Sequence, residues 1–227
     1  MNKIKYVLLT AGVLLAMAFT FSCSSGDGGD NSGSGCDKGN DIANYKIVSI
    51  GNQVWMAENL NYNIKDSKCY DNKERNCDKY GRLYDWVTAM DIDAKYKYLS
   101  WGRSDVKHRG ICPRGWHIPS KADWAELISY VESDNGCSGC AGRYLRTFGK
   151  GVDKYGFSAL PGGYGYSDGS FGGGADSVSG NGDWWSSSEI DSDRAYGTTA
   201  GPGPIFENIS YGYFDKSNLS SIRCVKD

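Results

Sequence analysis

Histidine is scarce in this sequence, because the 227 residues contain only His108 and His117. A zinc site needs three or four Cys, His or carboxylate ligands, so a catalytic zinc is not expected. A Ser-His-acid triad has no local support either, since the serines of WWSSSE (residues 184–189) have no nearby histidine and no Gly-x-Ser-x-Gly elbow around them. We expect His117 to pack or hydrogen-bond locally at a strand end, and we do not expect an enzyme.

Runs of positive charge are also absent. The chain has 25 Lys and Arg against 27 Asp and Glu, and its formal net charge is −2. Nothing here favours nucleic acid as a partner. The glycine-rich stretch contains no Gly-Lys-Ser or Gly-Lys-Thr, which argues against a phosphate loop. The apolar run over residues 7–21 is shorter than the about 20 residues of a membrane-spanning helix.

That apolar run instead predicts export. Lys3 and Lys5 precede it and Ser22-Cys23 follow it, as in a secretory signal peptide over residues 1–22. A cysteine after a small residue suggests lipoprotein processing with Cys23 lipidated, although the two residues before Ser22 depart from the usual lipobox. A plain secreted protein is the alternative. We expect a lipid-anchored protein of the outer membrane or cell surface that contacts the membrane through this anchor only.

The remaining chain divides into a tether and one domain. Residues 23–44 form the tether, because residues 23–40 are mostly Ser, Gly, Asp and Asn with no aliphatic residue to bury. Residues 45–227 are rich in Trp and Tyr and long enough for one domain with a substantial core.

Cysteine usage fits an oxidising, exported location. Seven cysteines accompany Cys23, and many pairing schemes are open in principle. We favour three disulfides and leave Cys36, in the tether, as the unpaired thiol. The favoured pairs are Cys69–Cys77, Cys112–Cys224 and Cys137–Cys140.

The pair Cys137 and Cys140 has the C-x-x-C spacing of redox motifs. It follows a predicted helix rather than preceding one, so a lowered thiol pKa is not expected. A thiol-dependent oxidase that uses Cys137 and Cys140, or Cys36, is nevertheless kept as an alternative function.

Local patterns predict one hairpin and two helices. Two β-rich runs around Gly51-Asn52 predict a hairpin within residues 45–60, and residues 69–77 read as a polar disulfide loop. Ser120 predicts a helix N-cap, with Asp123 completing a carboxylate form of the capping box. A second helical stripe is formed by Leu83, Trp86, Val87 and Met90.

The last third predicts strands and loops. Residues 162–182 contain nine glycines, too many for a helix. From Asp183 onward, short aromatic runs alternate with polar or Gly/Pro turns, which predicts antiparallel strands. The fold class is therefore α+β, with two helices packed on short antiparallel strands and a long Gly-rich loop region.

Six ordered motifs carry a family resemblance. IGNQVWMAENLNY, CYDN…YGRLYDWVTAM, CPRGWHIPSKADWAELI, YGFSALPGGY, WWSSSE and SIRCVKD together resemble the Fibrobacter succinogenes major paralogous domain family, over essentially all of residues 45–227. The resemblance implies an exported bacterial protein, often a lipoprotein, with a C-type lectin-like fold related to sulfatase-modifying factors. In such folds a disulfide reaches the last strand, which agrees with Cys112–Cys224.

The resemblance also implies a ligand-binding role for the last third. Tyrosine interleaved with Ser, Asn and Gly is the composition of adaptable binding surfaces, and aromatic faces suit sugar rings. The alternative is that several of these aromatics belong to the core, since neighbouring strand residues face opposite ways. We expect the domain to bind a glycan or a protein through Trp185, Tyr196, Phe206, Asn208, Tyr211, Tyr213 and Asn218.

No cofactor is expected, although a structural calcium ion is kept as an alternative. Calcium takes six to eight oxygens from carboxylates and carbonyls, but the Glu-Pro-Asn motif of calcium-dependent sugar-binding lectins is absent. A purely structural envelope protein is the third functional alternative. The candidate calcium ligands are Asp168, Asp176, Asp183, Glu189, Asp191 and Asp193.

Overall fold

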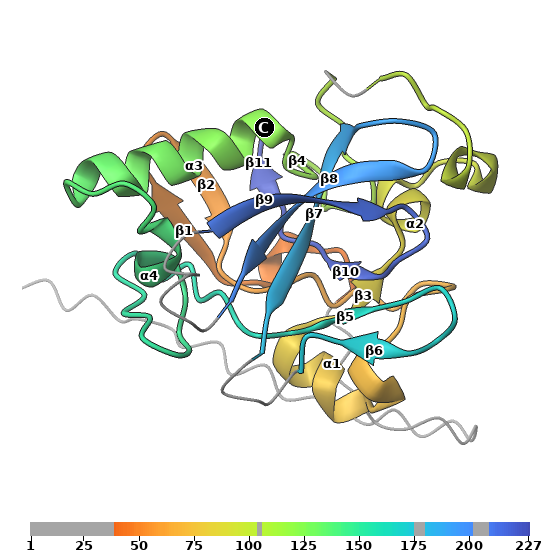
Figure 1. Ribbon diagram of the computed structural model, residues 1–227, viewed down its shortest axis with the longest axis horizontal. Coiled ribbons are helices and arrows are strands. Elements are labelled where there is room, and N and C mark those ends of the chain that lie inside the picture. The colour runs from red at the N-terminus through yellow and green to blue at the C-terminus, as the bar shows by residue number, and fades with distance from the viewer. Residues whose placement is uncertain (1–38, 104–105, 175–179, 202–208) are drawn as a thin grey trace, which may run out of the picture. The chain divides into compact units, whose positions relative to one another are not determined.

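Antiparallel sheet dominates the regular structure, as the alternation of aromatic runs and turns predicts. The computed structural model describes residues 39–103, 106–174, 180–201 and 209–227 (Figure 1). All of them belong to one compact unit, residues 35–227. Cys23 and Cys36 lie outside the described residues, as do the predicted signal peptide and most of the tether.

The first sheet joins the two ends of the described domain. Its strands are β1 (Ile47–Ile50), β2 (Gln53–Met56), β11 (Val225–Lys226) and β4 (Trp116–His117), paired antiparallel in the order β1-β2-β11-β4. The predicted hairpin is confirmed, with Ile50 opposite Gln53 across Gly51-Asn52. Gly51 has a φ of 58° and lies against the Tyr130 ring, which would meet any added Cβ at 2.8 Å.

The second sheet carries most of the last third. It consists of β3 (Leu83–Tyr84), β7 (Gly182–Glu189), β8 (Arg194–Ala200), β9 (Ile209–Asp215) and β10 (Ser220–Ser221). Its order is β3-β10-β7-β8-β9, with β10 parallel to β7 and the other pairs antiparallel. The predicted late strands are confirmed, apart from that one parallel pair. A separate two-stranded ribbon pairs β5 (Tyr164–Gly165) with β6 (Phe171–Gly172) in the Gly-rich region.

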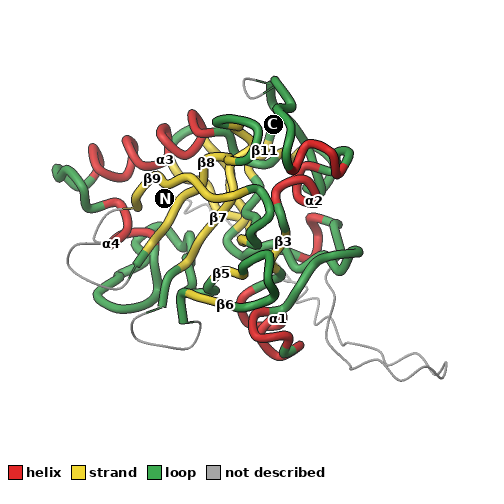
Figure 2. Tube along the Cα trace, turned by 45° about the vertical axis from the view of Figure 1, so that its right-hand side comes forward, coloured by secondary structure: helices red, strands yellow, loops and turns green. Residues whose placement is uncertain are grey.

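The long helix begins as predicted. In α3 (Lys121–Asp134) the Ser120 side chain accepts a hydrogen bond from the Asp123 backbone N–H, and the Asp123 carboxylate accepts one from the Ser120 backbone N–H. The capping box is therefore complete. Helix α3 contacts β1, β7 and β8, and Figure 2 shows it running along one side of the sheets.

Two local predictions need correction. Asp85 caps a short helix, α2 (Trp86–Met90), so Leu83 belongs to β3 instead of the predicted helical stripe. The supposed polar loop contains a 3-10 turn, η2 (Tyr70–Asn72), and then a helix, α1 (Glu74–Tyr80). The described chain thus has more than two helices, including α4 (Ala141–Leu145) and the 3-10 turns η1 (Ile42–Asn44) and η3 (Ala94–Lys97). None of the helices in the described residues is long and apolar enough to cross a bilayer.

Two hydrophobic clusters meet at the neighbours Trp184 and Trp185. Trp184 packs with Trp124 of α3, with ring centroids 6.3 Å apart, whereas Trp185 lies in the other cluster with Trp86. Both indoles are fully buried. Successive strand residues point to opposite faces, so β7 supplies one tryptophan to each side of its sheet.

The three predicted disulfides are present. Cys112–Cys224 connects the segment before β4 with the segment before β11, and both of its residues are fully buried. The other two close short loops, Cys69–Cys77 over η2 and α1, and Cys137–Cys140 between α3 and α4.

Candidate ligand-binding site

Three of the predicted ligand residues lie on one face of the second sheet. Tyr196 pairs with Tyr213 and Thr198 with Tyr211 across β8 and β9, so the tyrosines share a face. Tyr213 is 62% exposed and Tyr211 is 41% exposed. The Lys121 ammonium lies 4.2 Å from the Tyr196 ring centre, which places this tyrosine face beside the start of α3.

Trp185 is not part of any exposed surface, which corrects the prediction. It is fully buried, and its Nε1 donates to the Tyr84 carbonyl at 2.8 Å. Its ring packs edge-on against Phe214 at 5.6 Å. Phe206 and Asn208, also predicted to contact the ligand, lie outside the described residues.

Asn218 lines a cavity on the opposite face of the sheet. Thr199 and Phe214 line the same cavity. They follow Thr198 and Tyr213, which lie on the tyrosine face, and successive strand residues point to opposite faces of a sheet. The cavity has a volume of about 300 Å³, at the lower end of the range for ligand pockets. We call it the Asp183 pocket; its lining residues are Tyr164, Tyr166, Asn181, Asp183, Thr199, Phe214, Asn218 and Ser220.

A buried carboxylate is the distinctive group of this pocket. Asp183, on β7, is 3% exposed and accepts a hydrogen bond from the Thr199 hydroxyl. Burial raises the pKa of the Asp183 carboxyl to about 6, and the Thr199 hydrogen bond offsets only part of that rise. In the described part of the chain, no cation pairs with Asp183.

Two tyrosines form a wall of the pocket. Their hydroxyl oxygens are 3.1 Å apart, and the Tyr164 and Tyr166 rings meet edge to face at 5.2 Å. The hydrogen bond with Tyr166 and burial together raise the pKa of Tyr164 to about 12. A Cβ on Gly172 would come within 2.6 Å of the Tyr164 ring, so at least this glycine of the Gly-rich region is needed for close aromatic packing.

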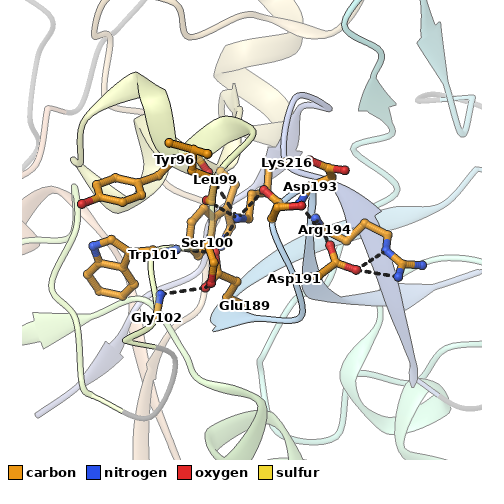
Figure 3. A network of polar contacts seen from close by, with 12 residues as sticks. Tyr96, Leu99, Ser100, Trp101, Gly102, Glu189, Asp191, Asp193, Arg194 and Lys216 are labelled. Atoms are coloured by element: carbon orange, nitrogen blue, oxygen red, sulfur yellow. Dashed lines mark hydrogen bonds and ion pairs between the residues drawn. The ribbon is translucent and has the colours of Figure 1, made fainter.

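A buried ion pair lies at the other end of β7 from Asp183 (Figure 3). The Lys216 ammonium is fully buried and donates to Glu189 and to the carbonyls of Tyr96, Leu99 and Ser192. Glu189 in turn accepts hydrogen bonds from the segment after η3, from Ser100 Oγ and the backbone N–H groups of Trp101 and Gly102. Burial raises the pKa of the Glu189 carboxyl, but the hydrogen bonds from Lys216 and from the segment after η3 outweigh this effect and lower the pKa.

The residues considered for calcium do not gather at one place. Glu189 pairs with Lys216, Asp191 with Arg194, and Asp168 with Ser170, while Asp183 lines the pocket. Asp193 lies in the same turn as Asp191, to which its backbone N–H donates, and Asp176 lies outside the described residues. Among the residues that the structure describes, the one group of three metal-type side chains is Cys69, Glu74 and Cys77, and its two sulfur atoms are joined in a disulfide.

His117 is buried at the end of β4, as predicted, and hydrogen-bonds to side chains nearby. Its Nδ1 is 2.8 Å from Asp227 Oδ1, and its Nε2 is 3.4 Å from Asp123 Oδ2. Burial raises the pKa of the Asp123 carboxyl, but the hydrogen bonds from His117 and Ser120 together have the larger effect. They lower this pKa below its ordinary value, to about 2. The ring therefore supports the start of α3.

A Gly-x-Ser-x-Gly pattern does occur elsewhere, at residues 165–169. It forms the exposed turn between β5 and β6, where the Tyr166 backbone N–H donates to the Ser170 carbonyl. A nucleophile elbow joins a strand to a helix, whereas this turn joins two strands.

The C-x-x-C motif follows α3, as predicted, but it also directly precedes a second helix, α4, which was not predicted. Cys140 is the N-cap residue of α4, although it makes no side-chain capping hydrogen bond. Its sulfur is bonded to Cys137. Sequence reasoning missed α4 because this helix has only five residues.

These features define an α+β domain with a small pocket, walled by aromatic rings around one buried carboxylate. The chain belongs to the family described as the Fibrobacter succinogenes major domain, whose model matches residues 48–226. This match confirms the family resemblance of the motifs. Comparisons with curated proteins and with solved structures each found no match.

Proposed function

We propose that this protein is a lipid-anchored, non-enzymatic module of the cell envelope that binds a glycan in the Asp183 pocket. The observation that carries the proposal is a nearly inaccessible carboxylate beside aromatic walls. Sugar rings offer apolar faces to aromatic rings and hydroxyl donors to carboxylate and amide oxygens. Tyr166 and Phe214 supply such rings here, and Asn181 and Asn218 supply amides.

The hydrogen bonding of Asp183 supports a ligand. An ionised carboxylate has room for about four hydrogen bonds, and burying it with few partners is unfavourable. Among the described residues, the Thr199 hydroxyl is the side-chain donor to the Asp183 carboxylate. A ligand donor in the pocket would satisfy the remaining acceptor sites.

We further propose that the domain has a C-type lectin-like fold. In support, β11 lies between β2 and β4, which brings the last strand beside the first hairpin. The Cys112–Cys224 bond anchors that last strand, as the family resemblance implies.

A glycan array probed with the full-length chain tests the function. We expect binding to at least one glycan class, and at least about a fivefold loss in Tyr166→Ala, because truncating a central aromatic contact typically costs more than about 1 kcal/mol. Tyr98→Ala is the matched control, since Tyr98 is 66% exposed and does not line the pocket. Binding that Tyr166→Ala leaves unchanged would refute the pocket assignment.

A protein partner on the tyrosine face is the second candidate. Tyr211 and Tyr213 are exposed side by side on β9, the edge strand of its sheet. Exposed tyrosines are frequent anchors in protein interfaces. Because this face and the Asp183 pocket are on opposite sides of the sheet, Tyr211→Ala with Tyr213→Ala would abolish partner capture without affecting the pocket.

The thiol-oxidase alternative has a separate test. Titration of free thiols in the folded full-length chain is expected to find no reactive pair at Cys137 and Cys140, because the two sulfur atoms are bonded to each other. A reactive dithiol there would favour the oxidase. A structural coat protein would instead show abundance at the surface and no ligand on either face.

A further inference from the structure

The Asp183 pocket contains one negative charge and, among its described lining residues, no positive one. The neighbours of Asp183 are neutral on every element that lines the pocket. Strands β8 and β9 contribute Thr199 and Phe214, while β10 and the turn before it contribute Ser220 and Asn218. Asn181, just before β7, is neutral as well.

The titratable neighbours do not supply a positive charge either. Tyr164 and Tyr166 can only be neutral or negative, and Tyr164 holds its proton to about pH 12. The carboxylate therefore faces the pocket with its charge uncompensated. Electrostatic interactions are stronger in such a buried site than in water.

We infer that the ligand carries a protonated amine, and that an amino sugar is the class of glycan that the Asp183 pocket selects. This inference rests on the proposed function, since it names the ligand of the same site. An ammonium group has three donors and no acceptor, which matches a carboxylate with unused acceptor sites. Hydrogen bonds between ionised partners are about twice as strong as neutral ones.

The aromatic walls favour the same class of ligand. A cation near the face of a Tyr or Phe ring is attracted by the ring quadrupole, and Tyr164, Tyr166 and Phe214 all line the pocket. The neutral amides and hydroxyls of Asn181, Asn218 and Ser220 remain for the hydroxyl groups of the sugar. A neutral sugar could use these groups and the rings, but it would leave the Asp183 charge unpaired.

Three β-1,4-linked tetrasaccharides that differ only at C2 test the inference. They are the oligomers of glucosamine, of N-acetylglucosamine and of glucose, and they place an ammonium, an amide or a hydroxyl at the same position. Calorimetry with the full-length chain, just above the pH at which Asp183 titrates, is expected to give the glucosamine oligomer at least about tenfold tighter binding, the scale of one charge-assisted hydrogen bond.

Variants then assign the preference to the carboxylate. Asp183→Asn keeps the size of the side chain and removes its charge, so the glucosamine oligomer should lose its advantage over the other two. Asp66→Asn is the matched control, since Asp66 is exposed and outside the pocket. Circular dichroism confirms that each variant is folded, and the comparison of the three sugars on the unmodified chain does not depend on any variant.

The outcomes separate this inference from the proposed function. Equal binding of all three sugars, weakened by Tyr166→Ala, would overturn the amine preference and leave the glycan pocket standing. A glucosamine preference that persists in Asp183→Asn would also overturn it. If none of the three binds, the amine inference fails, and the glycan array decides independently whether the pocket binds another glycan.

Discussion

The Thr199 hydroxyl donates to the buried carboxylate of Asp183, and this hydrogen bond joins β8 to β7 in the lining of the pocket. It only partly offsets the raised pKa of Asp183, which is about 6 against an ordinary value of 3.8. The folded protein therefore keeps an acidic group that is easier to protonate than in the unfolded chain.

That difference predicts a pH-dependent stability. Between about pH 4 and pH 6 the folded state binds a proton that the unfolded state has released, so the Asp183 contribution to the free energy of unfolding falls as the pH rises. A shift from 3.8 to about 6 corresponds to at most about 3 kcal/mol. Urea denaturation of the unmodified chain and of Asp183→Asn across this range measures the change. The free energy of unfolding of the unmodified chain, relative to that of the variant, should decline as the pH rises. A rise in this difference would contradict the description of Asp183 as a buried, unpaired carboxylate.

The Glu189–Lys216 pair is expected to be sensitive to the loss of one partner. Lys216→Met leaves Glu189 without its cation in a site where both side chains are almost inaccessible, and such changes typically destabilise by about 3–5 kcal/mol. The second single variant is Glu189→Gln. Chemical denaturation of both single variants and of the double variant gives the coupling energy between the two side chains. We expect the double variant to lose less stability than the sum of the single losses. Simple additivity would show that the pair is not coupled.

The capping box at the start of α3 should contribute about 1 kcal/mol. Ser120→Ala removes the acceptor for the Asp123 backbone N–H, and loss of such a cap usually costs about 0.5–2 kcal/mol. Ser133→Ala is the control, because Ser133 lies exposed on the same helix. Thermal denaturation measures the stability of both variants. Equal losses of stability in Ser120→Ala and Ser133→Ala would exclude a contribution from the cap.

The disulfides should differ in their effect on stability. Cys112–Cys224 spans 112 residues and Cys137–Cys140 spans 3, for which the chain-entropy model gives roughly 4–5 and roughly 1–2 kcal/mol. Replacing each pair by alanine and measuring unfolding in denaturant tests the contrast. A larger loss from the short-loop pair would contradict it.

Much of the fold could be predicted from local chemistry. Gly51-Asn52 identified the hairpin, Ser120 and Asp123 the start of α3, and the aromatic runs the late strands. Patterns of this kind depend on residues close in sequence, so they are readable without tertiary contacts. The α1 and α4 helices were missed because they have only seven and five residues, too few for a clear helical pattern. Each also lies beside a disulfide, and the spacing of the cysteines does not reveal the geometry of the chain there.

The site was harder to predict than the fold. Asn218 was expected to contact a ligand together with the tyrosines of β8 and β9, yet it lines the Asp183 pocket with Thr199 and Phe214, whose strand register places them on the other face of the sheet. Asp183 was considered only as a calcium ligand, because its burial depends on packing between segments distant in sequence. The partnership of Lys216 with Glu189 joins residues 27 apart and has no local signal.

A crystal structure of the full-length chain soaked with the glucosamine tetrasaccharide would show where the sugar binds. We expect one sugar ring in the Asp183 pocket, with its ammonium within hydrogen-bonding distance of the Asp183 carboxylate and a ring face against Tyr164, Tyr166 or Phe214. A sugar bound to the tyrosine face of Tyr196, Tyr211 and Tyr213, with the pocket left to solvent, would contradict it.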